Sequence, residues 1–75
     1  MVRYKNLGGD SGVVEYEIGP NFIKVKFGKS HKVYVYDYDS AGRDKIEQMK
    51  TLAKNGTGLN AFINQKAKEL YSRIE

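Results

Sequence analysis

The residues that could carry chemistry in this chain are concentrated in one stretch, residues 21–38. Between Asn21 and Tyr36 there is no acidic residue, whereas the basic side chains in this interval are Lys24, Lys26, Lys29, His31 and Lys32. A local excess of positive charge attracts the phosphates of nucleic acids. Lysines on an exposed hairpin are also ordinary solubilising residues, so the stretch indicates either a nucleic-acid contact or a hydrated surface.

Three tyrosines occupy alternate positions in the sequence VYVYDY, residues 33–38. In a β-strand, alternate side chains project from the same face, so Tyr34, Tyr36 and Tyr38 would share one face. Outward rings beside lysines would form a stacking platform for single-stranded nucleic acid. Inward rings would join the core and would keep the Asp37 carboxylate in water, where it needs no buried partner. We favour the inward arrangement, which makes Tyr34 and Tyr36 structural residues.

Patterns typical of enzymes and metal sites are weak in this sequence. His31 is the single histidine, there is no cysteine, and the acids are scattered, so no metal site is predicted. Ser11, Asp10 and His31 lack the context of a nucleophile elbow or a catalytic triad. We therefore predict a protein that is not an enzyme and that needs no cofactor.

Length and composition suggest the class of protein. A chain of 75 residues with a net charge of +4 forms one small domain of modest stability. The lack of cysteine favours a reducing compartment, and no segment has the apolar length of a membrane span or the pattern of a signal peptide. We expect a cytoplasmic protein with no membrane partner.

Alternating hydropathy predicts strands at residues 13–18, 22–27 and 33–38, with Gly19-Pro20-Asn21 as the turn between the first two. A two-residue loop would give apolar pairs on one face of this hairpin and opposite charges on the other. The predicted pairs are Ile18 with Ile23, Tyr16 with Val25, Val14 with Phe27, Glu17 with Lys24, and Glu15 with Lys26.

After the strands, the hydrophobic period changes from two to about 3.6, which predicts two helices. The first would be capped by Ser40 and would end at Asn55-Gly56, and the second would be capped by Thr57 and reach Ile74. The apolar positions are Ile46, Met49, Leu52 and Ala53 in the first helix, and Leu59, Phe62, Ile63, Ala67, Leu70, Tyr71 and Ile74 in the second.

The predicted fold class is α+β, with a three-stranded antiparallel β-meander followed by two helices packed on one face of the sheet. Residues 1–12 contain several glycines and are predicted to be a flexible or loosely attached segment. Residues 13–75 are predicted to form the single domain.

The sequence Tyr34-Val35-Tyr36, after a lysine-bearing strand and a glycine turn, resembles the Tyr-x-Tyr signature of the KTSC domain family. The likeness extends from about Val13 to the C-terminus, with FIKVKFGKSHKVYVY in its front half and GTGLNAFIN in its rear half. Family members often have a proline soon after the tyrosines, where this chain has Asp39-Ser40-Ala41-Gly42.

KTSC domains occur at the C-terminus of some bacterial lysyl-tRNA synthetases and alone in small bacterial or phage-encoded proteins. The resemblance therefore implies a bacterial or phage source and an association with RNA, and it carries the family motif to Tyr34 and Tyr36. It implies no catalytic role for either tyrosine.

Two functions follow as hypotheses. In the first, the protein is a small non-enzymatic binding module that contacts RNA through Lys24, Lys26, Lys29, His31 and Lys32, with salt-sensitive affinity and little sequence preference. In the second, it is a protein–protein interaction or homo-oligomerisation module that uses the uncovered face of the sheet. With the tyrosines inward, that face would present Glu15, Glu17, Lys24, Lys26, Val33 and Val35.

Overall fold

The structure is a computed structural model that describes residues 1–7, 9, 12–28 and 31–75. Most of the strands come first along the chain and the helices follow, in the order that the change of hydrophobic period predicted. The elements are β1 (Val2–Arg3), β2 (Val13–Ile18), β3 (Phe22–Phe27), β4 (Val33–Asp37), α1 (Tyr38–Ala41), α2 (Arg43–Asn55), α3 (Leu59–Phe62), the π-helical turn η1 (Ile63–Ala67) and β5 (Arg73–Ile74).

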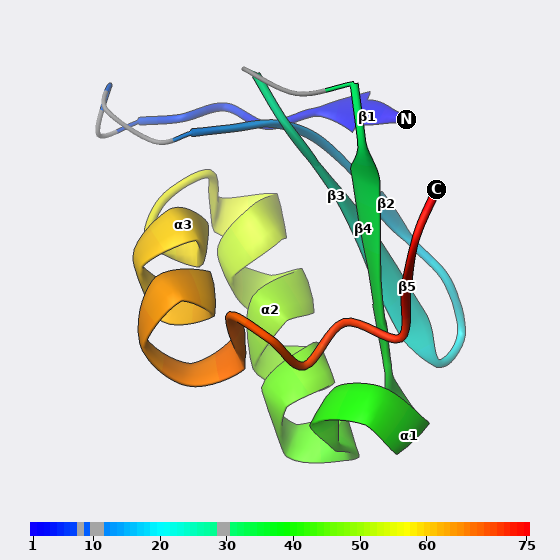
Figure 1. Cartoon of the computed structure of the whole chain (residues 1–75). Helices are drawn as coiled ribbons and strands as arrows, with labels where there is room; N and C mark the ends of the chain where they lie inside the picture. The colour runs from blue at the N-terminus through cyan, green and yellow to red at the C-terminus, as the bar shows by residue number, and fades with distance from the viewer. Residues whose placement is uncertain (8, 10–11, 29–30) are drawn as a thin grey trace.

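The strands form one antiparallel sheet in the order β1-β2-β3-β4-β5 (Figure 1). The three predicted strands correspond to β2, β3 and β4, and the α+β class is confirmed. The prediction of a three-stranded sheet is wrong, because β1 and β5 extend it to five strands. Each of these edge strands is two residues long, which is too short to produce an alternating pattern that the sequence could reveal.

The predicted register of the β2–β3 hairpin is confirmed at four of its positions and wrong at one. Phe27 lies opposite Val13, and not opposite Val14, because the ladder is irregular between Val13 and Glu15. A β-bulge inserts an extra residue and so changes which side chain faces the core. Val13 is 0% exposed and Val14 is 38% exposed. The confirmed pairs are Ile18 with Ile23, Tyr16 with Val25, Glu17 with Lys24, and Glu15 with Lys26.

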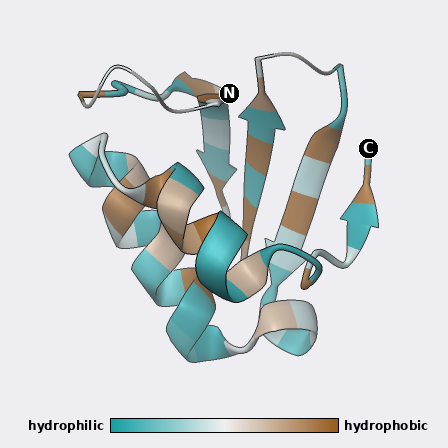
Figure 2. Cartoon of the chain, turned by 60° about the vertical axis from the view of Figure 1, so that its left-hand side comes forward, coloured by the Kyte–Doolittle hydropathy of each residue, from teal (hydrophilic) through white to brown (hydrophobic). Residues whose placement is uncertain are grey.

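The helices lie on one side of the sheet, and the hydrophobic core lies between the two layers (Figure 1). Hydrophobic and hydrophilic residues alternate along the strands in Figure 2, as expected for a sheet with one covered face. Tyr36 is 1% exposed, and Tyr34 packs against the core, so both point inward as predicted. Tyr38 is not part of the strand, because it is the first residue of α1.

The first helical segment begins at a different residue from the one predicted. Asp37, and not Ser40, is the N-cap of α1: its Oδ1 atom accepts a hydrogen bond of 2.7 Å from the backbone N–H of Ser40. In return, the backbone N–H of Asp37 donates to Ser40 Oγ at 3.1 Å, which completes a capping box. The single turn of α1 ends at Gly42, and α2 then continues to Asn55. Gly56 follows in the left-handed conformation, as predicted for the end of this helix.

The second predicted helix is wrong at both ends. Its N-cap is Gly58, with φ 83°, and not Thr57, and its helical turns end with η1 at Ala67, short of Ile74. The chain then returns to the sheet, where the N–H of Ser72 donates to the carbonyl of Val35 at 2.6 Å. Among the described helices, none is both long enough and apolar enough to span a bilayer.

The described part of the N-terminal segment is joined to the domain by specific contacts. Tyr4 is 3% exposed and belongs to the core, and its hydroxyl accepts a hydrogen bond of 3.3 Å from the backbone N–H of Leu59. The N–H of Leu7 donates to the carbonyl of Gly56 at 2.7 Å. Residues 2–7 therefore connect the edge of the sheet to the loop between α2 and α3.

Candidate functional site

The candidate site is a cavity of about 370 Å³, which we call the tyrosine pocket. Strands β3 and β4 supply aromatic side chains from the helix-covered face of the sheet, and the η1 turn and the segment after it supply the facing wall. The period-two alternation of the strands brings Phe27, Tyr34 and Tyr36 to one face. The full lining consists of Phe27, Tyr34, Tyr36, Ile63, Asn64, Lys68, Glu69 and Tyr71.

Four aromatic rings of the tyrosine pocket contact one another in sequence. The ring centroids of Phe27 and Tyr34 are 5.5 Å apart, and those of Tyr34 and Tyr71 are 5.2 Å apart. Tyr71 also meets Tyr36, at 6.4 Å. All three contacts are edge-to-face, with interplanar angles of 81–86°, which is a favoured geometry for aromatic pairs. Tyr71 is 36% exposed, so part of this aromatic surface remains accessible to a ligand.

The buried Tyr36 phenol remains neutral at physiological pH. Burial, with smaller contributions from the neighbouring Tyr34 and Tyr71, raises the pKa of Tyr36 to about 12. A neutral phenol donates and accepts hydrogen bonds but is a poor general base near pH 7. The arrangement is suited to binding a flat, polar molecule.

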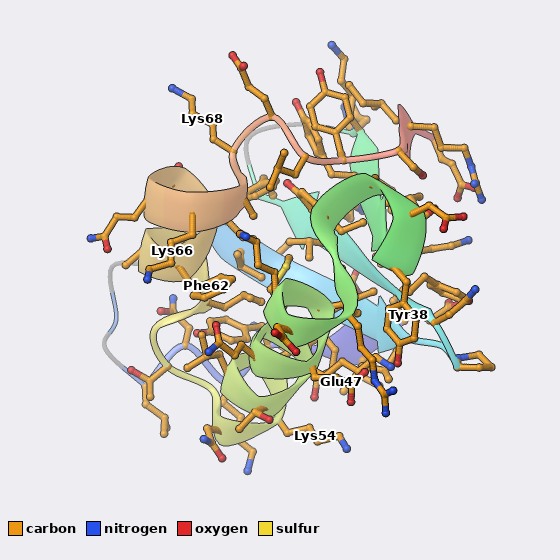
Figure 3. The ribbon with its side chains drawn as sticks, turned by 90° about the horizontal axis from the view of Figure 1, so that it is seen from below. Tyr38, Glu47, Lys54, Phe62, Lys66 and Lys68 are labelled. Atoms are coloured by element: carbon orange, nitrogen blue, oxygen red, sulfur yellow. The ribbon has the colours of Figure 1, made fainter. Side chains whose placement is uncertain are left out.

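Polar side chains at the mouth of the tyrosine pocket are available for a ligand. Asn64, Lys68 and Glu69 are exposed, and Figure 3 shows Lys68 extending outward from the segment after η1. Among the described residues, we find no hydrogen bond or ion pair made by these three side chains. They supply an amide, a cation and a carboxylate beside the aromatic wall.

The predicted nucleic-acid-binding lysines of β3 lie on the other face of the sheet. Lys24 Nζ is 3.0 Å from Glu75 Oε1, and Lys26 Nζ is 3.8 Å from Glu15 Oε1. Their side chains are 24% and 36% exposed. These ion pairs partly neutralise the positive charge that the sequence pattern indicated, and the two lysines do not reach the tyrosine pocket.

The other predicted basic residues in the described part of the chain are His31 and Lys32. His31 and Lys32 are exposed, immediately before β4 begins at Val33, and Lys29 lies outside the described residues. Strand β3 ends with Phe27 and β4 begins one residue before Tyr34, and both of these rings line the tyrosine pocket. Among the described residues, the structure therefore places Lys24 and Lys26 on the open face of the sheet, and His31 and Lys32 directly before the strand that carries Tyr34 and Tyr36.

The uncovered sheet face carries the side chains that the inward arrangement of tyrosines predicted. Besides the lysine pairs, Arg73 on β5 forms an ion pair of 2.8 Å with Glu75. Val35 is on this face but is only 2% exposed, which leaves little apolar surface for a partner.

A second hollow, of about 550 Å³, lies on the outer side of the helices. Leu52 and Phe62 provide its apolar floor, and Figure 3 shows Phe62 and Lys66 together on this side of the helical layer. Glu47 at its other end accepts a hydrogen bond of 2.7 Å from the Tyr38 hydroxyl. That bond is the main reason why the pKa of Glu47 lies below its usual range. We assign no ligand to this hollow, because its surroundings do not indicate what would fill it.

Half of the tyrosine pocket was missed by sequence analysis. The alternation in β4 identified Tyr34 and Tyr36, but Asn64, Lys68 and Glu69 gave no signal. Tyr71 was placed on the inward stripe of a helix, because its spacing fits the period of 3.6. It reaches the pocket instead from the irregular segment between η1 and β5.

The described residues contain no group of three or more His, Cys, Asp or Glu side chains that could hold a metal ion. We compared the chain with protein-family models, with curated proteins and with solved structures, and none of the three comparisons gave a match. The resemblance to the KTSC family therefore stays a prediction.

Proposed function

We propose that this protein is a small, non-enzymatic, cytoplasmic module that binds single-stranded RNA, with the tyrosine pocket and the nearby His31 and Lys32 as its site. The observation that carries the proposal is the position of the pocket. Aromatic rings from β3, β4 and the segment before β5 line a cavity, and the basic residues His31 and Lys32 come directly before the strand that carries Tyr34 and Tyr36.

Exposed aromatic rings and nearby cations are the two components of single-stranded nucleic-acid sites. A base that stacks on an aromatic side chain contributes roughly 1–3 kcal/mol, and each lysine near a phosphate adds a salt-dependent term. In this chain, the exposed part of Tyr71 offers the stacking surface. Lys68 lines the pocket and Lys32 lies two residues before Tyr34, so both supply positive charge near this surface.

The structure changes which of the sequence-predicted residues the proposal emphasises. Lys24 and Lys26 face away from the pocket and have acidic partners, so we assign them a minor, long-range contribution. Lys68 was not among the predicted residues and joins the site because it lines the pocket.

Fluorescence anisotropy with a short, labelled single-stranded RNA of mixed sequence tests the proposal at low and at moderate salt. We expect measurable binding at low salt that weakens as salt increases, with a slope of about −0.7 for each phosphate contact. Lys32→Ala and Lys68→Ala should each weaken binding and reduce this slope. Tyr71→Ala should weaken binding while the protein stays folded, because the ring is partly exposed.

Lys54→Ala is the matched control, since Lys54 is an exposed lysine of α2 far from Lys68 in Figure 3. It changes the net charge by the same amount and should leave affinity close to that of the unmodified protein. The proposal is wrong if RNA does not bind at low salt, or if Lys54→Ala weakens binding as much as Lys68→Ala does.

The alternative function, self-association or protein binding through the uncovered sheet face, has less support. The ion pairs of Lys24, Lys26 and Arg73 occupy that face, and Val35 is nearly inaccessible beneath them. Light scattering over a range of concentrations measures self-association directly. A protein that stays monomeric at high concentration would exclude self-association. Val33→Glu puts a charge on this face, and a dimer that dissociates on this substitution would favour self-association over RNA binding.

A further inference from the structure

The tyrosine pocket has polar groups whose arrangement bears on which base it accepts. This inference rests on the proposed function, because it concerns the base that the RNA site would hold. Lys68 and Glu69 are consecutive residues that both line the pocket. Within the described residues, neither side chain has a hydrogen-bond or ion-pair partner, so both can turn to a ligand.

A carboxylate accepts hydrogen bonds and cannot donate them, and it accepts best from two parallel N–H groups. The Watson–Crick edge of guanine offers two neighbouring N–H donors, at N1 and N2, with the O6 acceptor next to them. Bases held by aromatic side chains in RNA-binding proteins are commonly read along this edge. Glu69 can accept both N–H groups of guanine while the Lys68 ammonium donates to O6.

The other bases fit this pair of side chains less well. Adenine and cytosine present one amino group beside ring acceptors, and uracil presents one N–H between two carbonyl oxygens. Each of them leaves one oxygen of the Glu69 carboxylate without a donor, and their acceptor atoms would be turned toward that negative charge. A polar group that loses its water and finds no partner disfavours the complex, which is how sites of this kind reject the wrong ligand.

We infer that the tyrosine pocket prefers guanine, with Glu69 accepting from the N1 and N2 groups, Lys68 donating to O6, and Tyr71 providing part of the stacking surface. Asn64 lines the same pocket and supplies an amide that can bond the remaining edge of the base or the ribose. Because Glu69 is exposed, water competes for its carboxylate. The ratio of affinities for guanine and for another base should therefore lie toward the lower end of the range for contacts with two hydrogen bonds.

The test uses labelled oligouridine of fixed length in which the central base is guanine, adenine, cytosine or uracil. Anisotropy titrations should show about tenfold tighter binding of the guanine-containing RNA, within the range of base discrimination by bidentate side-chain contacts. Glu69→Gln should remove most of this preference, because a side-chain amide has a single acceptor oxygen. Asp44→Asn, which changes an exposed acid in the first turn of α2, is the control and should retain the preference.

The outcomes separate this inference from the proposed function. Equal binding of all four RNAs would overturn the guanine preference and leave the RNA-binding proposal in place. Failure of every RNA to bind would overturn both. A guanine preference that Glu69→Gln does not alter would overturn the assignment of Glu69, and tighter binding of another base would overturn the inference as a whole.

Discussion

Replacing Tyr4 by phenylalanine removes one buried hydroxyl and keeps the aromatic ring in the core. In the folded protein, this hydroxyl accepts the hydrogen bond from the N–H of Leu59, the first residue of α3. Gly58 is the N-cap of that helix and has no side chain to take over the role. The variant therefore leaves a buried N–H without its acceptor.

The magnitude follows from the length and burial of this bond. An unsatisfied buried donor destabilises a protein by roughly 1–3 kcal/mol. At 3.3 Å the bond is long, so we take the lower part of this range, about 1 kcal/mol. A loss of that size lowers the melting temperature of a domain of this size by about 4–8 °C. It lowers the urea midpoint by about 0.3–1 M.

Urea unfolding, followed by far-ultraviolet circular dichroism, measures this loss. Tyr38→Phe is the matched control, because it also removes a tyrosine hydroxyl that has a hydrogen-bond partner, Glu47, but this bond is solvent-exposed and water replaces it. We expect Tyr38→Phe to lower the free energy of unfolding by less than half as much as Tyr4→Phe does. The reasoning is refuted if the two variants are equally stable, or if Tyr4→Phe unfolds at the same urea concentration as the unmodified protein.

Three further predictions concern stability. Tyr36→Ala should cost about 3–5 kcal/mol, because the ring is 1% exposed, and denaturant titration would contradict this if the loss were below about 1 kcal/mol. Gly56→Ala should destabilise more than Gly42→Ala: both glycines have positive φ, but a Cβ at position 56 would lie 2.6 Å from Lys5 Cβ, whereas position 42 has no atom within 4 Å. The pKa of Asp37 is lowered in the folded protein, chiefly by the backbone N–H of Ser40, so its contribution to stability is present above the unfolded pKa and is lost as the pH falls through the folded pKa. Asp37→Asn keeps a capping side chain without the charge, so its free energy of unfolding should fall less than that of the unmodified protein between neutral and acidic pH. Equal pH dependence of the free energy of unfolding in the two proteins would contradict this role of Asp37.

The central strands and the first long helix could be predicted because each is specified by its own residues. The alternating side chains of β2 and β3, with Gly19-Pro20-Asn21 between them, set four of the five predicted pairs. The end of α2 was readable for the same reason, since Asn55-Gly56 is a local sequence that favours a left-handed residue. The inward direction of Tyr36 followed from physical reasoning about where a carboxylate can be placed.

The features that were missed depend on partners far away in the chain. Val13 and Val14 are equally apolar, so the sequence cannot show which one the bulge turns toward the core. Ile74 continues a helical spacing, but its backbone segment pairs with β4, opposite Tyr34. The polar lining of the pocket also depends on distant partners, because Lys68 and Glu69 line it together with the rings of β3 and β4.

The hydrogen bond between Leu59 and Tyr4 joins residues that are 55 positions apart, whereas the hairpins of the meander join neighbours in sequence. Contacts between distant residues require a large loop to close and are expected to form late in folding. In kinetic terms, breaking this bond should speed unfolding and leave the refolding rate nearly unchanged. The contact of the N-terminal segment with α3 would then set the unfolding rate, and so the lifetime of the folded state, while having little effect on the folding rate.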